Sequence, residues 1–178
     1  MINYGAKELA AAFRTVRRNT LQVARDIPED KYDFVAAPGC RPVRAMLAHI
    51  AAGATLQFDV HRDRRLTTLQ GYNWGEFTAR GAAFEAVPRT KDEILALLER
   101  SGEEYAQWVA GLGAEFLNET YTDSTGQNPK TRFESIMSVK EHEMHHRAQL
   151  MMIVRLLGGV PHLTRERLAR AAAAAATR

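Results

Sequence analysis

The sequence predicts an all-α protein, a four-helix bundle with long connections and a short extra C-terminal helix. Apolar residues recur at three- and four-residue steps in four long segments, which is the period of an amphipathic helix. Two of these segments open with a Thr-x-x-Glu capping box, and proline or glycine marks an end of each. We therefore expect a bundle domain over residues 1–162 and an alanine- and arginine-rich tail helix over residues 163–178.

The first helix is expected over residues 3–26, where Leu9, Phe13, Val16, Thr20, Val23 and Ile27 keep the helical spacing. Pro28 ends it, because proline has no N–H with which to continue the hydrogen-bond ladder. The arginines of this segment fall on other faces, and we expect them to be solvated: Arg14, Arg17, Arg18 and Arg25. Residues 28–40 form a connection long enough to run the length of a helix.

The second helix is expected over residues 41–65, with Pro42 in its first turn. His49 lies on the apolar stripe of this helix, among small residues. On its own, such a histidine is more often an ordinary core residue than a ligand. Residues 66–89 are expected to be irregular, with room for a short helix over residues 76–84. Tyr72, Trp74 and Phe77 are expected to cover the end of the core.

The third helix starts at the capping box of Thr90 and Glu93 and weakens near Gly111 and Gly113. Residues 117–131 have the composition of a loop, with a short β segment conceivable at 119–122. The fourth helix runs from the capping box at Thr131 to residue 157, where two glycines and then a proline stop it.

Three histidines are expected to share one divalent metal ion. His142 and His146 are four residues apart on the fourth helix and lie within its apolar stripe, with His145 at the flank and Glu143 off the ligand face. Burying polar rings is costly unless they are bonded. A single ion bound by His49, His142 and His146 would bond a nitrogen of each ring and leave coordination positions open for water or substrate. For three imidazole ligands we expect Zn or Ni, with Fe, Co, Cu or Mn as alternatives.

The same segment formally matches the His-Glu-x-x-His pattern of metalloproteases. Those enzymes need a third ligand downstream, and the histidine available there, His162, follows the two glycines that end the helix. Glu143 is not expected to be a general base. We therefore do not favour a protease.

Two motifs resemble the DinB/YfiT-like family. Residues 142–150, His-Glu-Met-His-His-Arg-Ala-Gln-Leu, followed by Gly-Gly-Val-Pro at 158–161, resemble its last helix, and residues 44–50 resemble its second-helix histidine segment. One departure is Ala148, where glycine is common. The resemblance implies an up-down-down-up bundle, a three-histidine metal site matching His49, His142 and His146, and often a homodimer. Characterised relatives include transferases and isomerases that use bacillithiol or mycothiol.

Three functions remain open. The first is a metal-dependent S-transferase or isomerase that activates a low-molecular-weight thiol. The second is a metal-dependent hydrolase, and the third is a non-catalytic, metal-stabilised binding or dimerisation module.

Composition limits the partners and the location of the protein. The net charge of +3 gives no reason to expect nucleic acid, and no apolar run approaches the ~20 residues needed to cross a bilayer. The single cysteine, Cys40, excludes an internal disulfide and fits a reducing cytoplasm, and the first residues lack the features of a signal peptide. We expect a cytoplasmic protein with a small-molecule substrate.

Overall fold

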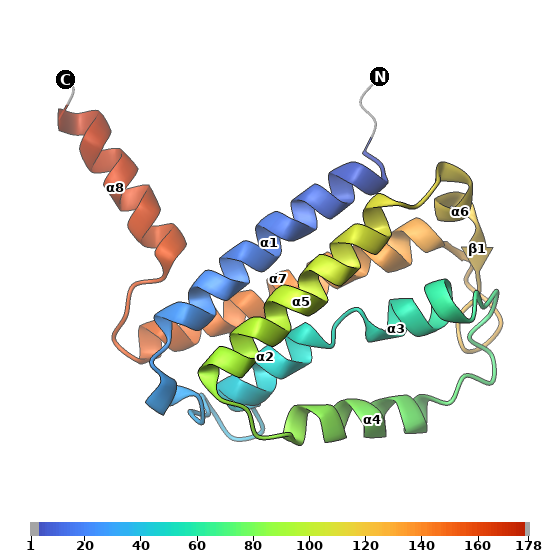
Figure 1. Ribbon diagram of the computed structural model, residues 1–178, viewed down its shortest axis with the longest axis horizontal. Coiled ribbons are helices and arrows are strands. Elements are labelled where there is room, and N and C mark those ends of the chain that lie inside the picture. The colour runs from blue at the N-terminus through green and yellow to red at the C-terminus, as the bar shows by residue number, and fades with distance from the viewer. Residues whose placement is uncertain (1–3, 177–178) are drawn as a thin grey trace.

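The computed structural model describes residues 4–176 and shows the expected all-α four-helix bundle (Figure 1). Its long segments are α1 (Ala6–Asp26), α2 (Val43–Ala51) with its continuations α3 (Thr55–Gln57) and the π-helix η2 (Phe58–Asp63), α5 (Lys91–Ala110) and α7 (Arg132–Leu156). The shorter elements are the 3₁₀-helix η1 (Glu29–Lys31), α4 (Trp74–Ala86), α6 (Ala114–Asn118), the antiparallel strands β1 (Thr120–Tyr121) and β2 (Lys130–Thr131), and α8 (His162–Ala176). Figure 1 shows α8 projecting away from the bundle.

Two clusters of buried apolar side chains fix the directions of the helices. One cluster joins the C-terminal halves of α1 and α7 to α2 and the start of α5. The other joins the N-terminal halves of α1 and α7 to the end of α5, and the chain beyond α2 reaches it at Ala54. Hence α1 and α7 run in one direction while α2 and α5 run in the other, the up-down-down-up order.

The second helix is broken, so the prediction of one continuous helix over residues 41–65 was wrong. α2 ends at Ala51, and after a turn at residues 52–54 the chain resumes as α3 and the π-helix η2. Gly53 lies in this turn, and a Cβ on it would stand 3.3 Å from Nδ1 of His142 and 3.1 Å from the carbonyl oxygen of Ile50. The missing side chain therefore gives the imidazole of His142 room beside the break.

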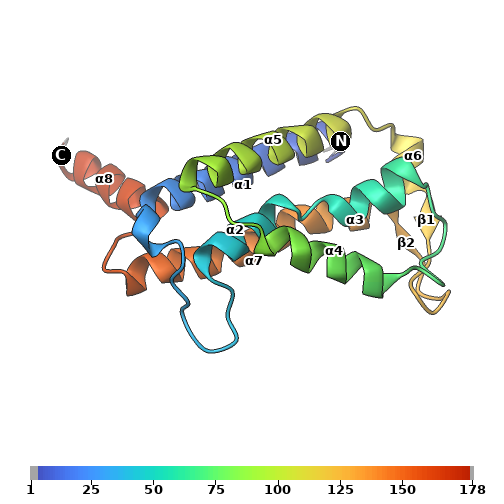
Figure 2. The same cartoon turned by 60° about the horizontal axis from the view of Figure 1, so that its bottom comes forward.

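The connection between α2 and α5 contains a regular helix. Within the segment 66–89, the short helix considered over residues 76–84 is present and longer, as α4, whose N-cap Asn73 accepts a hydrogen bond from the backbone N–H of Glu76. Figure 2 shows α4 on the outside of the bundle beside α2, which it contacts. Since α2 and α5 are parallel, the chain must return along the bundle between them, and α4 makes that return.

The predicted helix caps at Thr90 and Thr131 are confirmed. Each hydroxyl accepts a hydrogen bond from the backbone N–H three residues on, and the glutamate at that position reaches back to the cap. Gly158 follows α7 with φ of 82°, a left-handed conformation that glycine adopts without strain.

A buried polar network closes the end of the bundle where α7 begins. Arg132, which is 1% exposed, donates from Nη1 to Nδ1 of His61 (2.8 Å) and pairs with Glu119 (2.8 Å). Nε2 of His61 must then carry the proton, which it donates to the hydroxyl of Ser135 (2.9 Å). Burial, and then the positive charge of Arg132, lowers the pKa of His61 to about 4.

We predict that His61 makes folding sensitive to acid. Its pKa is about 4 when folded and about 6.5 when unfolded, so the unfolded state binds more protons between these values. The protonation of this residue therefore leaves the free energy of unfolding unchanged above pH 6.5 and decreases it as the pH falls toward 4, by about 3 kcal/mol in total. Urea unfolding across this range should show a shallower pH dependence for His61→Gln than for the wild type. Equal slopes would contradict the assignment.

Candidate metal centre

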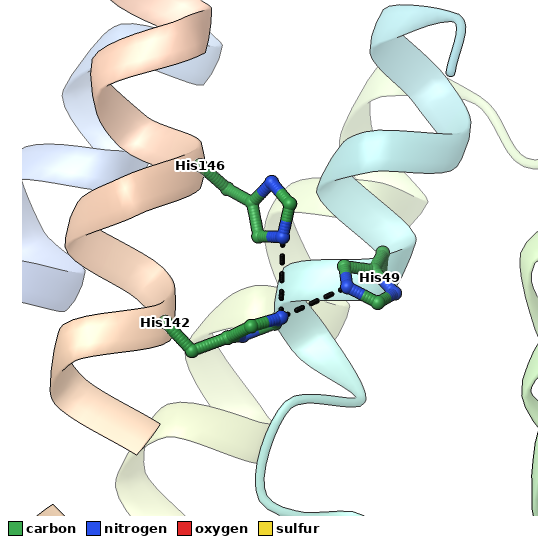
Figure 3. A group of neighbouring side chains, drawn as sticks. All are labelled: His49, His142 and His146. Carbon is green, nitrogen blue, oxygen red and sulfur yellow. Dashed lines mark hydrogen bonds between the residues drawn. The ribbon is translucent and has the colours of Figure 1, made fainter. Parts of the chain in front are cut away.

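Three imidazole rings from two helices converge between α2 and α7 (Figure 3). His49 comes from α2, whereas His142 and His146 come from successive turns of α7. Nε2 of His142 lies 2.9 Å from Nε2 of His49 and 3.1 Å from Nε2 of His146, and the three ligand atoms of the cluster all lie within 4.8 Å of one another. The structure thus brings together the three histidines that the sequence singled out.

The cluster is half-buried. His146 is 8% exposed, while His49 and His142 are of intermediate burial. The stripe of α7 that carries the two histidines continues as buried Val139, Leu150 and Ile153. The helical period that predicted this stripe therefore placed the rings correctly against the core.

The outer nitrogen of His49 is bound to a carboxylate. Nδ1 of His49 donates to Oε1 of Glu85 on α4 (2.7 Å), and Arg41 donates to the other oxygen (2.6 Å). Burial opposes the ionisation of Glu85, but the hydrogen bonds from Arg41 and His49 outweigh it and lower the pKa of this carboxyl. The charged carboxylate holds the proton of His49 on Nδ1, which directs the lone pair of Nε2 toward the cluster.

The outer nitrogen of His146 is bound in the same way by an amide. Nδ1 of His146 donates to Oε1 of Gln149 (2.8 Å), and Nε2 of Gln149 donates to Nε2 of His145 (3.1 Å). The exposed His145 therefore orients Gln149 rather than joining the cluster. As at His49, the lone pair of Nε2 of His146 is directed inward.

The inward-facing nitrogens fit a divalent metal ion. Two nitrogens bound to one ion at about 2.1 Å can be at most about 4.2 Å apart. Both separations from His142 lie within that limit, and the separation between His49 and His146 lies within 4.8 Å. Without an ion, Nε2 of His142 lies between the lone pairs of His49 and His146, and a single N–H on that nitrogen cannot donate well to both of them. A cation at that position would accept electron pairs from all three rings.

The protonation state of the cluster suits metal binding. Burial, and then the neighbouring imidazoles, lowers the pKa of His142 to about 4, and burial lowers the pKa of His146. Both rings are therefore neutral at pH 7, which is the form that binds metals.

Glu143 is turned away from the cluster. Its carboxylate is 1% exposed and pairs with Arg17 of α1, with Nη2 2.9 Å from Oε2. The prediction that Arg17 lies on a solvated face was wrong, since it is 6% exposed. Removing one partner of such a buried ion pair costs about 3–5 kcal/mol. A carboxylate held in this way is not free to act as the base of a metalloprotease.

Sequence reasoning missed Glu85, Gln149 and the partner of Glu143. Gln149 is three residues after His146 and four after His145, so helical spacing alone could have indicated it. Glu85 lies in a segment expected to be irregular, and no local pattern there points to His49.

A model of a known protein family matches most of the chain. The family model described as the DinB superfamily matches residues 12–150. No curated protein matches the chain. Among the described residues, none of the helices is long and apolar enough to cross a membrane.

Three solved structures are similar in fold. A DinB-like protein from Bacillus subtilis is 18% identical with a TM-score of 0.63, over 86% of this chain and 93% of that one. YfiT from Bacillus subtilis, described as a probable metal-dependent hydrolase with an unusual four-helix bundle topology, is 14% identical with a TM-score of 0.64, over 86% and 88%. DfsB, described as a sibling lethal factor precursor, is 16% identical with a TM-score of 0.69, over 89% and 100%.

We predict that Glu85→Gln weakens metal binding about 10-fold, because the neutral amide no longer fixes the proton of His49 on Nδ1. Competition with a chromophoric chelator measures the Zn²⁺ affinity. Glu99→Gln, which removes a carboxylate from an exposed ion pair with Arg25, is the matched control. Equal affinities of the Glu85 variant and the wild type would remove Glu85 from the site.

Proposed function

Because the chain belongs to the DinB superfamily, we propose that it is a divalent-metal-dependent enzyme acting on a small molecule. His49, His142 and His146 bind the ion in this proposal. The observation that carries it is the convergence of their three Nε2 atoms, with the outer nitrogens of His49 and His146 already bound to Glu85 and Gln149. Structural metal sites use four protein ligands, whereas three leave a position for a reactant.

Hydrolysis is the reaction that we place first. The support is that YfiT, which shares this fold, is described as a probable metal-dependent hydrolase. A divalent ion bound here would lower the pKa of a bound water and polarise a carbonyl. The protein's own residues Glu85 and Gln149 would hold two of the ligating rings in orientation, and α4 would cover one side of the site.

Transfer or isomerisation with a low-molecular-weight thiol is the second candidate. It is supported by the resemblance of residues 142–150 to a family whose characterised members include enzymes that use such thiols. A bound ion would hold the thiol as thiolate, which is the nucleophilic form. The two candidates differ in one requirement, since a hydrolase turns over its substrate with no thiol present.

Zn or Ni is the proposed metal, with Fe, Co, Cu or Mn as alternatives, because neutral imidazoles suit all of these ions better than the hard cations Ca and Mg. We also propose a cytoplasmic homodimer in which residues 1–162 form the metal-binding domain and residues 163–178 form a separate tail, helical as far as Ala176. Light scattering on the full chain and on a chain ending at residue 162 tests whether the protein is a dimer and whether residues 1–162 form a domain without the tail.

We predict that the purified wild type carries close to one divalent ion per chain, measured by elemental analysis. His49→Ala, His142→Ala and His146→Ala should each retain less than about a tenth of it, because two imidazoles bind far more weakly than three. His162→Ala, a histidine outside the cluster, should retain the ion. Negligible metal in all five proteins, even after incubation with Zn²⁺, Ni²⁺ and Co²⁺, would overturn the proposal.

Turnover of ester and amide libraries by the metal-loaded wild type, with and without added thiol, separates the candidates. Turnover without thiol supports the hydrolase, whereas turnover that requires thiol supports the transferase. If chelation lowers the melting temperature or dissociates the dimer and no substrate is turned over, the protein is a metal-stabilised module.

A further inference from the structure

A buried ion pair lies behind the histidine cluster, and none of the functions considered above uses it. Arg17 of α1 and Glu143 of α7 are 6% and 1% exposed. Nε of Arg17 lies 2.9 and 3.0 Å from the two carboxylate oxygens, and Nη2 lies 2.9 Å from Oε2. Such a bidentate pair fixes the relative position of the two helices that carry it.

The remaining donors of Arg17 reach two more helices. Nη1 donates to the carbonyl oxygen of Leu98 (2.5 Å) and to the hydroxyl of Ser101 (3.0 Å), both on α5. Nη2 also donates to the carbonyl oxygen of Ile50 on α2, at 3.4 Å. All three nitrogens of the guanidinium therefore have acceptors, and the four long helices meet at one side chain.

The acceptors of Arg17 are next in sequence to the metal-site histidines. Ile50 follows His49 on α2, and Glu143 follows His142 on α7. The carbonyl of Ile50 lies at the break of the second helix, where it accepts a hydrogen bond from Gly53 three residues on. A shift of Arg17 would therefore move the backbone on both sides of the cluster.

A glycine of α5 lies directly against the side chain of Arg17. Gly102 of α5 faces it, and a Cβ on Gly102 would stand 2.8 Å from Cγ and 2.9 Å from Nη1 of Arg17. Glycine in the interior of a helix lowers helix stability relative to alanine. The glycine at this position thus makes room for the guanidinium at the expense of helix propensity.

We infer that Arg17 and Glu143 are positioning residues of the metal site, an ion pair that holds α2 and α7 at the separation that lets His49 meet His142 and His146. The inference rests on the proposed function, because it assigns the pair to the geometry of that metal site. An ion pair with a purely structural role would affect stability and leave the metal unchanged.

The experiment compares two variants that disturb the pair in different ways. Arg17→Lys keeps the charge but loses the planar fork, and Gly102→Ala keeps both charges but displaces the side chain. Each has a matched control. Arg14→Lys alters an exposed ion pair one turn earlier on α1, also formed with α5. Gly81→Ala adds a methyl group inside α4, where no atom lies within 4 Å.

Co²⁺ affinity and the visible absorption of bound Co²⁺ are measured for each full-length protein, with circular dichroism to establish folding. We expect Arg17→Lys and Gly102→Ala to bind Co²⁺ about 10-fold more weakly than the wild type, with altered absorption bands, since these follow the ligand geometry. The two control variants should match the wild type. If Arg17→Lys does not fold, Gly102→Ala decides the question.

Wild-type affinity and spectrum in the folded variants, even with lowered melting temperatures, would overturn the inference and leave the proposed function intact. If the wild type itself binds no Co²⁺, Zn²⁺ or Ni²⁺, the proposed function fails, and the ion pair has no metal site to position.

Discussion

Imidazole rings buried between two helices of an apolar bundle must have their polar atoms bonded, and this requirement organises the centre of the molecule. Glu85 and Gln149 bind the outer nitrogens of His49 and His146. That leaves the inner nitrogens facing one another, in a space that a cation fits. Behind the rings, the charges of Arg17 and Glu143 meet the same requirement by pairing with each other. The polar groups buried at the centre of the bundle thus form a candidate metal site and the ion pair behind it, while Arg132 and His61 form a separate network at the end of the bundle.

The topology of the bundle supplies part of the site. Because α2 and α5 run in the same direction, the chain has to return along the bundle between them, and it does so as α4 on the outside of α2. That return brings Glu85 against His49, 36 residues earlier in the chain. A bundle of antiparallel neighbours with short loops has no such segment. The unusual order of the helices therefore has a chemical consequence, which is a carboxylate bound to a histidine of the cluster.

Helical periodicity was sufficient to predict the number of long segments and the side of α7 that carries His142 and His146, because both follow from local spacing, but it did not predict the break in the second segment. It failed where contacts distant in sequence decide the outcome. Arg17 has the polarity of a surface residue, and its burial is explained only by the acceptors that it meets on other helices, above all the glutamate on α7. The break after Ala51 includes Gly53, which lies against the imidazole of His142 from α7, a contact that local spacing does not indicate. Glu85 sits on a helix with little buried surface, so no apolar pattern marked it.

X-ray absorption of the zinc-loaded wild type at the zinc edge tests the central claim most directly, since it counts the ligands of the ion. The account predicts three imidazole nitrogens at about 2.0–2.1 Å and at least one further light atom from solvent or substrate. A spectrum with one imidazole or none, in a protein that holds a full equivalent of zinc, would place the metal elsewhere and contradict the assignment of His49, His142 and His146.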